Sequence, residues 1–249
     1  MRKLFVIGIG TGNPEHLSMQ AIAALNRTDV IFIPTKGEEK SALAAIRTTI
    51  CERYISRPYE LVEYPISARN EAIGDYTQRV LDWHDLIAQS YIEMFAKAPE
   101  DAIGALLVWG DPGLYDSTLR ILESVKAKSD LAFTIEVIPG ITAIAALTAA
   151  FTIPLNTIGN PVTITTGRKL AAGWPEGSDT VVVMLDGNKT YASIDPTGLH
   201  IYWAAYAGMG DQLLIEGPLL DVRDQISAAR DAARARHGWI MDIYLLRRT

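Results

Sequence analysis

The spacing of apolar residues changes between two periods along the first part of the chain. Apolar runs that end at turn residues, LFVIGI at 4–9 and DVIFIP at 29–34, are typical of buried strands. Between and after them, apolar residues three and four apart predict helices, the longest over 73–94, and Ser18 is the expected N-cap of the first. Strands that alternate with helices and lack polar positions predict a mainly parallel sheet in an α/β domain.

Further along the chain, strands dominate. A helix with apolar residues at 119, 122 and 125 precedes the strand run FTIEVIPG, and a second helix is expected near 226–236. Short Gly, Pro and Asp turns separate the strand runs PVTITTG, TVVVMLDG, HIYWAAYAG, QLLIEGPL and GWIMDIYLL. This pattern predicts an α+β domain with a mixed or largely antiparallel sheet. We therefore expect two domains, residues 1–114 and 115–249.

Composition narrows the class of protein. The 249 residues are 49% hydrophobic and 21% charged, which is typical of globular proteins, and the net charge of -6 disfavours nucleic acid as a partner. Cys51 stands alone, so no disulfide framework or cysteine-based zinc site is expected. The four histidines show no metal-binding spacing, and we expect no metal.

Neither a secretion signal nor a membrane segment is expected. The N-terminus MRKLF leads directly into a strand run, without the long apolar stretch of a signal peptide. The most apolar region, 138–155, contains Pro139, Gly140 and Pro154 and is expected to be a loop and a small-residue helix within the protein. These features predict a cytoplasmic protein with no membrane partner.

The opening turn GIGTGN only partly matches a dinucleotide-binding fingerprint. That fingerprint needs G-x-G-x-x-G, but here Asn13 stands where the third glycine is required, and Pro14 follows directly. The acidic residue that should end the second strand is also misplaced, because Asp29 precedes that strand and Lys36 follows it. An NAD-dependent oxidoreductase thus remains a minor alternative.

Two later turns are more informative. In VWGDPGLYDSTLR, residues 108–120, a strand ends in a tight turn at the carboxyl edge of the sheet, where open α/β folds bind ligands. In VIPGITAIAA, residues 137–146, a Pro-Gly pair stands before a helix whose first turn offers free N–H groups and the hydroxyl of Thr142. Each turn alone is weak evidence of a ligand site, because each is also compatible with an ordinary loop.

Together with the opening turn and the later strand VVVML, these segments resemble the tetrapyrrole (uroporphyrinogen and precorrin) methyltransferases over the whole chain. The resemblance implies their two-domain fold and S-adenosylmethionine as cofactor, with S-adenosylhomocysteine as product. The stretches TITTGRKLA, IYWAAYAG and RARHGWIMDIYLLRR are similar to the subgroup that methylates C-1 of precorrin-5 and releases the ring's acetyl group as acetate. A small tetrapyrrole is then the substrate, and a homodimer is expected from the family.

The resemblance also implies which residues form the site, with the cofactor between the domains. The implied cofactor contacts are Gly110, Asp111, Leu114, Tyr115, Thr142, Ala143, Met184, Ala205, Tyr206 and Ala207. The opening turn would line the substrate trough, and cations would have to receive the carboxylates of the macrocycle. The candidate substrate contacts are Gly10, Thr11, Gly12, Arg120, Arg168 and Lys169, although each of the three cations could equally be a solvated surface charge.

The chain departs from the family pattern at the opening turn and at its end. Thr11-Gly12 stands where relatives often have Pro-Gly, and Ser18 stands where a threonine is usual, with His16 just before Leu17. These changes would alter contacts with the macrocycle. The last strand reads GWIMD without the common proline, which leaves the cofactor contact there open.

The two chemical steps make different demands. Methyl transfer from a sulfonium needs alignment in a desolvated pocket, whereas loss of an acetyl group needs water to be activated by a general base. Candidates for that second step are His16, Tyr115, Asp116 and Asp186. Asp111 is expected to cap its own turn instead, and Asp116 could equally cap the next helix.

Other functions stay open at this point. A methyltransferase of the same fold could act on another precorrin, on diphthamide or on ribosomal RNA, although the negative charge disfavours RNA. A protein that binds the cofactor without turnover would carry the same loops.

Overall fold

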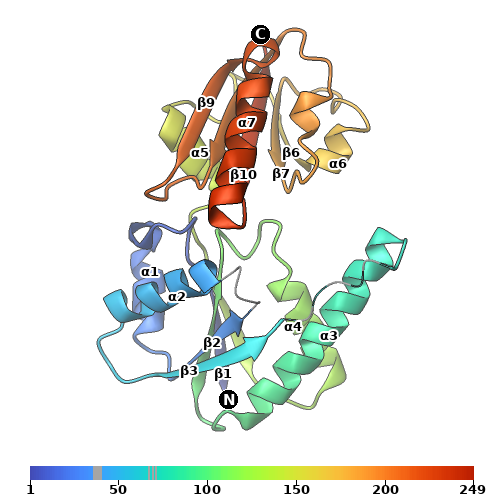
Figure 1. Cartoon of the computed structure of the whole chain (residues 1–249). Coiled ribbons are helices and arrows are strands. Elements are labelled where there is room, and N and C mark those ends of the chain that lie inside the picture. Colours follow the sequence, from blue (N-terminus) through green and yellow to red (C-terminus); the bar gives the residue numbers. More distant parts are fainter. Residues whose placement is uncertain (36–40, 67, 69, 71) are drawn as a thin grey trace. The chain divides into compact units, whose positions relative to one another are not determined.

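The computed structural model describes residues 1–35, 41–66, 68, 70 and 72–249, with the side chains of 41–44 not described. The chain divides into two compact units, Met1–Ile141 and Thr142–Thr249, which we describe separately (Figure 1). Lys36, which entered the argument against a dinucleotide site, lies outside the described residues.

The first unit is built on a parallel sheet. Its strands are β1 (Lys3–Gly8), β2 (Val30–Thr35), β3 (Glu60–Pro65), β4 (Ile103–Val108) and β5 (Thr134–Ile138), in the spatial order β3-β2-β4-β1-β5. Every described pairing in it is parallel. The prediction of a mainly parallel α/β unit is confirmed, and the carboxyl ends of all five strands lie at one edge.

Helices cover both faces of this sheet. They are α1 (Met19–Leu25), α2 (Ser41–Tyr54), α3 (Tyr76–Lys97) and α4 (Thr118–Lys128), with a short 3-10 helix η1 (Pro14–His16). Leu4 and Val6 of β1 pack with α3 and α4, whereas Phe5 and Ile7 pack with α1 and α2. Successive side chains of a strand point to opposite faces, so β1 is apolar from Leu4 to Ile7 because both faces are buried there.

Capping residues fix where the helices begin. The Ser18 hydroxyl accepts a hydrogen bond from the backbone N–H of Ala21, as predicted for the first helix. The long helix α3 begins at Tyr76 rather than near Ile73, because the Asp75 carboxylate caps it through the N–H of Gln78. Among the described helices, none is both long and apolar enough to cross a membrane.

The boundary between the units lies after Ile141, which differs from the predicted division after Leu114. The reason is the long-range pairing of β5 with β1, register Lys3 to Thr134, which keeps β5 and the helix α4 before it in the first unit. The change from mainly helical to mainly strand segments along the chain after Leu114 therefore does not coincide with the domain boundary.

The second unit contains a mixed sheet in the order β6-β7-β10-β8-β9. Its strands are β6 (Val162–Thr166), β7 (Thr180–Met184), β8 (Leu199–Ala205), β9 (Leu213–Pro218) and β10 (Asp242–Arg248). Only β6 and β7 pair in parallel, and the other three pairings are antiparallel. The predicted mixed sheet is confirmed.

The helices of this unit are α5 (Ala143–Phe151), the short α6 (Gly167–Leu170), the 3-10 helix η3 (Thr190–Ala192) and α7 (Leu219–His237). The helix α7 runs along the sheet, as Figure 1 shows. Successive residues of β8 face the two helices: Tyr202 makes an edge-to-face contact with Phe151 of α5, whereas Trp203 shares the acceptor Asp242 with Arg230 of α7. The long helices α5 and α7 thus cover opposite faces.

Candidate active site

In the first unit, three glycine turns converge at the carboxyl edge of the sheet. Gly10 and Gly110 exchange backbone hydrogen bonds of 3.3 and 2.7 Å, which joins the opening turn to the turn after β4. A Cβ on Gly8 would lie 2.6 Å from the nitrogen of Gly140, so the turn after β5 packs directly on β1. Only glycine permits backbones to approach this closely. The turns after β1, β4 and β5 therefore form one continuous main-chain surface.

Asp111 ties two of these turns together. Its Oδ1 accepts a hydrogen bond of 2.7 Å from the N–H of Gly113, and its Oδ2 accepts one of 2.9 Å from the N–H of Gly140. The first bond caps its own turn, in agreement with the structural role expected from sequence. The second, over 29 residues of sequence, holds the GDP turn against the PGIT turn.

The opening turn places a histidine and a hydroxyl side by side. Gly10 and Gly12 have φ of 74° and 111°, values that favour glycine. Between them Thr11 is buried, and its Oγ1 lies 3.0 Å from Nδ1 of the half-buried His16. Burial lowers the pKa of His16, and the nearby Glu15 carboxylate partly opposes this shift.

The predicted residues after the GDP turn have different environments. Tyr115 is exposed and has a φ of 51°, outside the usual range for a residue with a side chain. The Asp116 carboxylate accepts a hydrogen bond of 2.7 Å from the N–H of Thr118 and thus caps the start of α4. The exposed Arg120 donates to the carbonyl of Asp116. Leu114 is half-buried on the turn itself.

In the second unit, the strand register brings the predicted cofactor segments to one edge of the sheet. Met184, at the end of β7, pairs with Thr166 of β6, and Ala205, at the end of β8, pairs with Asp242 of β10. Arg168 and Lys169 follow Thr166 on α6 and are exposed. Ala143 is the first residue of α5, and the hydroxyl of Thr142 caps that helix through the N–H of Ala145.

Asp186 follows β7 by two residues, and its buried carboxylate is a hydrogen-bond acceptor. Its carboxylate is 7% exposed and accepts from the N–H groups of Asn188 and Thr190, from the Thr190 hydroxyl, and from the hydroxyl of Tyr244. Burial and this carboxylate raise the pKa of Tyr244. A Cβ on Gly167 would lie 2.7 Å from the Asp186 Cβ, so the TTG turn packs on it. The carboxylate thus orders two turns of the second unit.

Replacing Asp186 with asparagine should lower the free energy of unfolding by about 1–3 kcal/mol, because an amide nitrogen would face donors that now have an acceptor. Urea unfolding followed by tryptophan fluorescence measures the change. Asp195→Asn is the matched control, since that exposed carboxylate accepts a hydrogen bond from the N–H of Thr197 in its own turn. Equal stability of the two variants would contradict the ordering role.

Three residues with a strained backbone lie in the loops that are predicted to contact the cofactor. Tyr115, Leu185 and Tyr206 all have φ between 51° and 55°, and each follows a strand in a predicted cofactor loop. Such strain in residues with side chains is concentrated at functional sites. Leu185 is also 65% exposed.

The side chain of Tyr206 turns into its own unit. Its hydroxyl donates to the carbonyl of Trp239 at 2.7 Å, and its ring meets that of Trp239 edge to face and packs tilted against that of His237. Its neighbours Ala205 and Ala207 are buried. Any contact of Tyr206 with a ligand must therefore use its main chain, a detail that the residue type alone could not show.

Two buried arginines were missed in the sequence. Arg47 on α2 is 8% exposed, donates to the carbonyl of Leu107 at 3.0 Å and lies over the ring of Trp109. Arg230 on α7 is 4% exposed and pairs with Asp242 at 2.8 Å. Arg47 stands three residues before the buried Ile50, and Arg230 stands four residues after the buried Ile226; a cation at such an inward position of a helix was the available signal.

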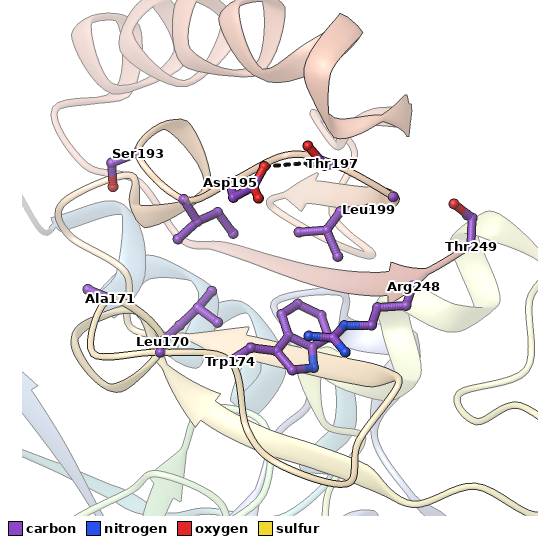
Figure 2. Close-up of a pocket in the computed structure, with 12 residues that line it drawn as sticks. Leu170, Ala171, Trp174, Ser193, Asp195, Thr197, Leu199, Arg248 and Thr249 are labelled. Atoms are coloured by element: carbon purple, nitrogen blue, oxygen red, sulfur yellow. Dashed lines mark hydrogen bonds between the residues drawn. The ribbon is translucent and has the colours of Figure 1, made fainter.

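A cavity of about 550 Å³ opens elsewhere in the second unit. It lies at the opposite edge of the sheet, where β8 begins and β10 ends, and Figure 2 shows Arg248 beside Trp174 in its wall. None of the predicted site residues lines it. Within the described part of the chain, no three His, Cys, Asp or Glu side chains cluster in a way that could hold a metal ion.

Known proteins are similar to this chain in both sequence and architecture. Residues 3–222 match the model of the tetrapyrrole (corrin/porphyrin) methylases. The chain belongs to this family. Over its full length it is 51% identical to precorrin-6A synthase [deacetylating] of Sinorhizobium sp., covering 96% of that protein. This identity makes the protein a methyltransferase and removes the support for a dinucleotide-dependent oxidoreductase.

Solved structures agree with the fold. The cobalamin-synthesis-related protein CobF from Corynebacterium diphtheriae superposes with a TM-score of 0.83 at 37% identity, covering all of this chain and 99% of that one. Uroporphyrin-III C-methyltransferase from Thermus thermophilus, solved with S-adenosylhomocysteine, gives a TM-score of 0.60 at 16% identity over 98% of this chain and 91% of its own. The two-domain methylase fold predicted from the sequence is confirmed.

Proposed function

We propose that this methyltransferase acts on precorrin-5, methylating C-1 from S-adenosylmethionine and releasing the ring's acetyl group as acetate to give precorrin-6A. The observation that carries the proposal is the 51% identity to precorrin-6A synthase [deacetylating] over the whole chain and 96% of that relative. Identity at this level, without large insertions, supports the same reaction more strongly than a shared fold, which hosts many functions.

We further propose that residues of both units hold S-adenosylmethionine, which supplies an activated methyl group. The first unit would contribute Gly110, Asp111, Leu114 and Tyr115, and the second would contribute Thr142, Ala143, Met184 and the segment 205–207. The residues fit such a ligand, because close glycine contacts join the three turns and the Asp111 carboxylate fixes the spacing of two of them. Main-chain donors and acceptors suit the uncharged edge of an adenine and a zwitterionic amino acid.

The substrate would be held by the opening turn and by cations. Gly10, Thr11 and Gly12 form a fixed turn, and Arg120, Arg168 and Lys169 are exposed on helical segments of their units. Such side chains can pair with the carboxylates of a tetrapyrrole. Without local cations, the net negative charge of the protein would repel those carboxylates. The proposal includes a cytoplasmic homodimer, as in the family.

A ligand comparison tests the cofactor. S-adenosylhomocysteine at about 100 times its dissociation constant should stabilise the protein by about 2.7 kcal/mol, whereas NAD should leave the melting temperature unchanged. Thermal-shift curves with each ligand give both values. Stabilisation by NAD and not by S-adenosylhomocysteine would overturn the cofactor assignment.

A further inference from the structure

The proposed reaction has a step that positioning alone does not accelerate. Transfer of a sulfonium methyl group depends mainly on alignment, whereas cleavage of an acetyl group by water depends on a base that removes a proton from that water. The inference below rests on the proposed function and concerns only this second step.

One imidazole at the carboxyl edge of the first sheet is held in place from two sides. His16 Nδ1 lies 3.0 Å from the Thr11 hydroxyl oxygen, and Thr11 itself is 7% exposed. On the other side, a Cβ on Gly10 would lie 2.5 Å from the Cβ of His16, so the histidine packs on the main chain of Gly10. Gly10 in turn exchanges backbone hydrogen bonds with Gly110. The imidazole is thus anchored to the GDP turn.

We infer that His16 is the general base that activates water for acetyl loss, and that Thr11 is the positioning residue that sets its orientation and tautomer. With its proton on Nδ1, His16 donates to the Thr11 oxygen, and Nε2 carries the lone pair. Among the described residues, Nε2 receives no hydrogen bond. This is how a second polar group selects the basic nitrogen of a catalytic histidine.

At His16, burial outweighs the neighbouring negative charge and favours the neutral ring. Glu15 is adjacent, but its carboxylate pairs with Arg53 of α2 at 3.1 Å, which reduces its pull on the proton. Burial keeps the pKa of His16 below 6.5 despite Glu15. A base with a lowered pKa is unprotonated at neutral pH and loses activity only as the pH falls through that pKa.

The other three candidates fit the role less well. The Asp186 carboxylate accepts four hydrogen bonds in the second unit, and the Asp116 carboxylate caps α4. Tyr115 carries a phenol, which donates a proton or a hydrogen bond more readily than it accepts a proton at neutral pH. Of the four, His16 alone combines a free basic nitrogen with fixed neighbours.

His16 Nε2 takes one proton from water as the water oxygen bonds to the acetyl carbonyl carbon. The C–C bond from that carbon to the ring then breaks, its electron pair passes into the conjugated ring, and acetate leaves with loss of the second proton. The ring spends one electron pair on its bond to the incoming methyl carbon as the S–C bond breaks, which releases S-adenosylhomocysteine.

Four variants of the full chain test this inference with precorrin-5 and S-adenosylmethionine. His16→Gln should lower the rate of acetate formation by about 10²–10⁴-fold. Thr11→Val should lower it by about tenfold, the effect of one hydrogen bond, and Thr11→Ser should restore it. His84→Gln is the matched control, since His84 also pairs with a hydroxyl, that of Ser117 at 2.8 Å, and should leave the rate unchanged.

Two further readouts separate catalysis from structure. The affinity for S-adenosylhomocysteine should stay within about twofold in all four variants, because none removes a proposed cofactor contact. In the wild type, kcat/KM for acetate formation should fall as the pH drops through the lowered pKa of His16, and this acidic limb should disappear in His16→Gln. Acetate formation at the wild-type rate in His16→Gln would overturn the inference. So would a loss of affinity for S-adenosylhomocysteine in that variant as large as its loss of acetate formation. A wild type that methylates no precorrin would instead refute the proposed function.

Discussion

Replacing Gly140 with alanine is expected to lower the affinity for S-adenosylhomocysteine by about 100-fold or more. The new Cβ would lie 2.7 Å from the carbonyl carbon of Gly8 and nearer still to the carbonyl oxygen of Gly110. All of these neighbours are backbone atoms, so no side chain can turn away, and the three turns must separate. A displacement of about 1 Å at a positioned site costs about 10²-fold. Isothermal titration calorimetry measures the affinity directly.

Gly74→Ala is the matched control for this variant. Within the part of the chain that the structure describes, no atom beyond its own sequence neighbours lies within 4 Å of a Cβ at Gly74, and its backbone is not in the left-handed region. It should bind like the wild type. The Gly140 variant should also unfold more easily, by about 1–3 kcal/mol, as overpacked sites do. Unchanged affinity in Gly140→Ala would show that the convergence of the three turns has no part in cofactor binding.

Removing the carboxylate of Asp242 should produce the largest loss of stability. Asp242 accepts from Arg230 Nε at 2.8 Å and from Trp203 Nε1 at 3.1 Å, and the two charged side chains are 8% and 4% exposed. Breaking one half of a buried ion pair leaves the other charge without compensation and costs about 3–5 kcal/mol. Asp242→Ala should therefore lower the free energy of unfolding by that amount in urea.

A double variant shows whether the lost charge is the cause. Arg230→Met with Asp242→Leu removes both charges and fills the space with apolar groups, which is often close to neutral at buried ion pairs. It should recover most of the stability that Asp242→Ala loses. A double variant as unstable as the single one would attribute the loss to packing instead.

The sequence allowed the local elements to be predicted because their signals are local. Ser18 capped the first helix as expected, and the apolar runs became the strands of both sheets. The domain boundary was missed because β5 joins β1 across more than a hundred residues, and no local pattern encodes such a pairing. The start of α3 was misplaced because an apolar residue, Ile73, precedes the capping Asp75.

The candidate site was predictable in part. The glycine turns could be assigned from their spacing, but their mutual contacts depend on the strand order β4-β1-β5, which only the fold reveals. Asp186 is one of the four sequence candidates for the water-activating step, yet four donors surround its carboxylate in the fold. The pairing of Thr11 with His16 was not foreseen, because a turn of this shape requires the φ values of Gly10 and Gly12.

Incubation with precorrin-5 and methyl-labelled S-adenosylmethionine shows directly whether the protein methylates precorrin-5 and releases its acetyl group. Mass spectrometry of the tetrapyrrole and enzymatic determination of acetate give the two products in one reaction. We expect a singly methylated ring that has lost its acetyl group, with one acetate released for each methyl group transferred. A methylated ring that keeps its acetyl group, with no free acetate, would contradict this expectation.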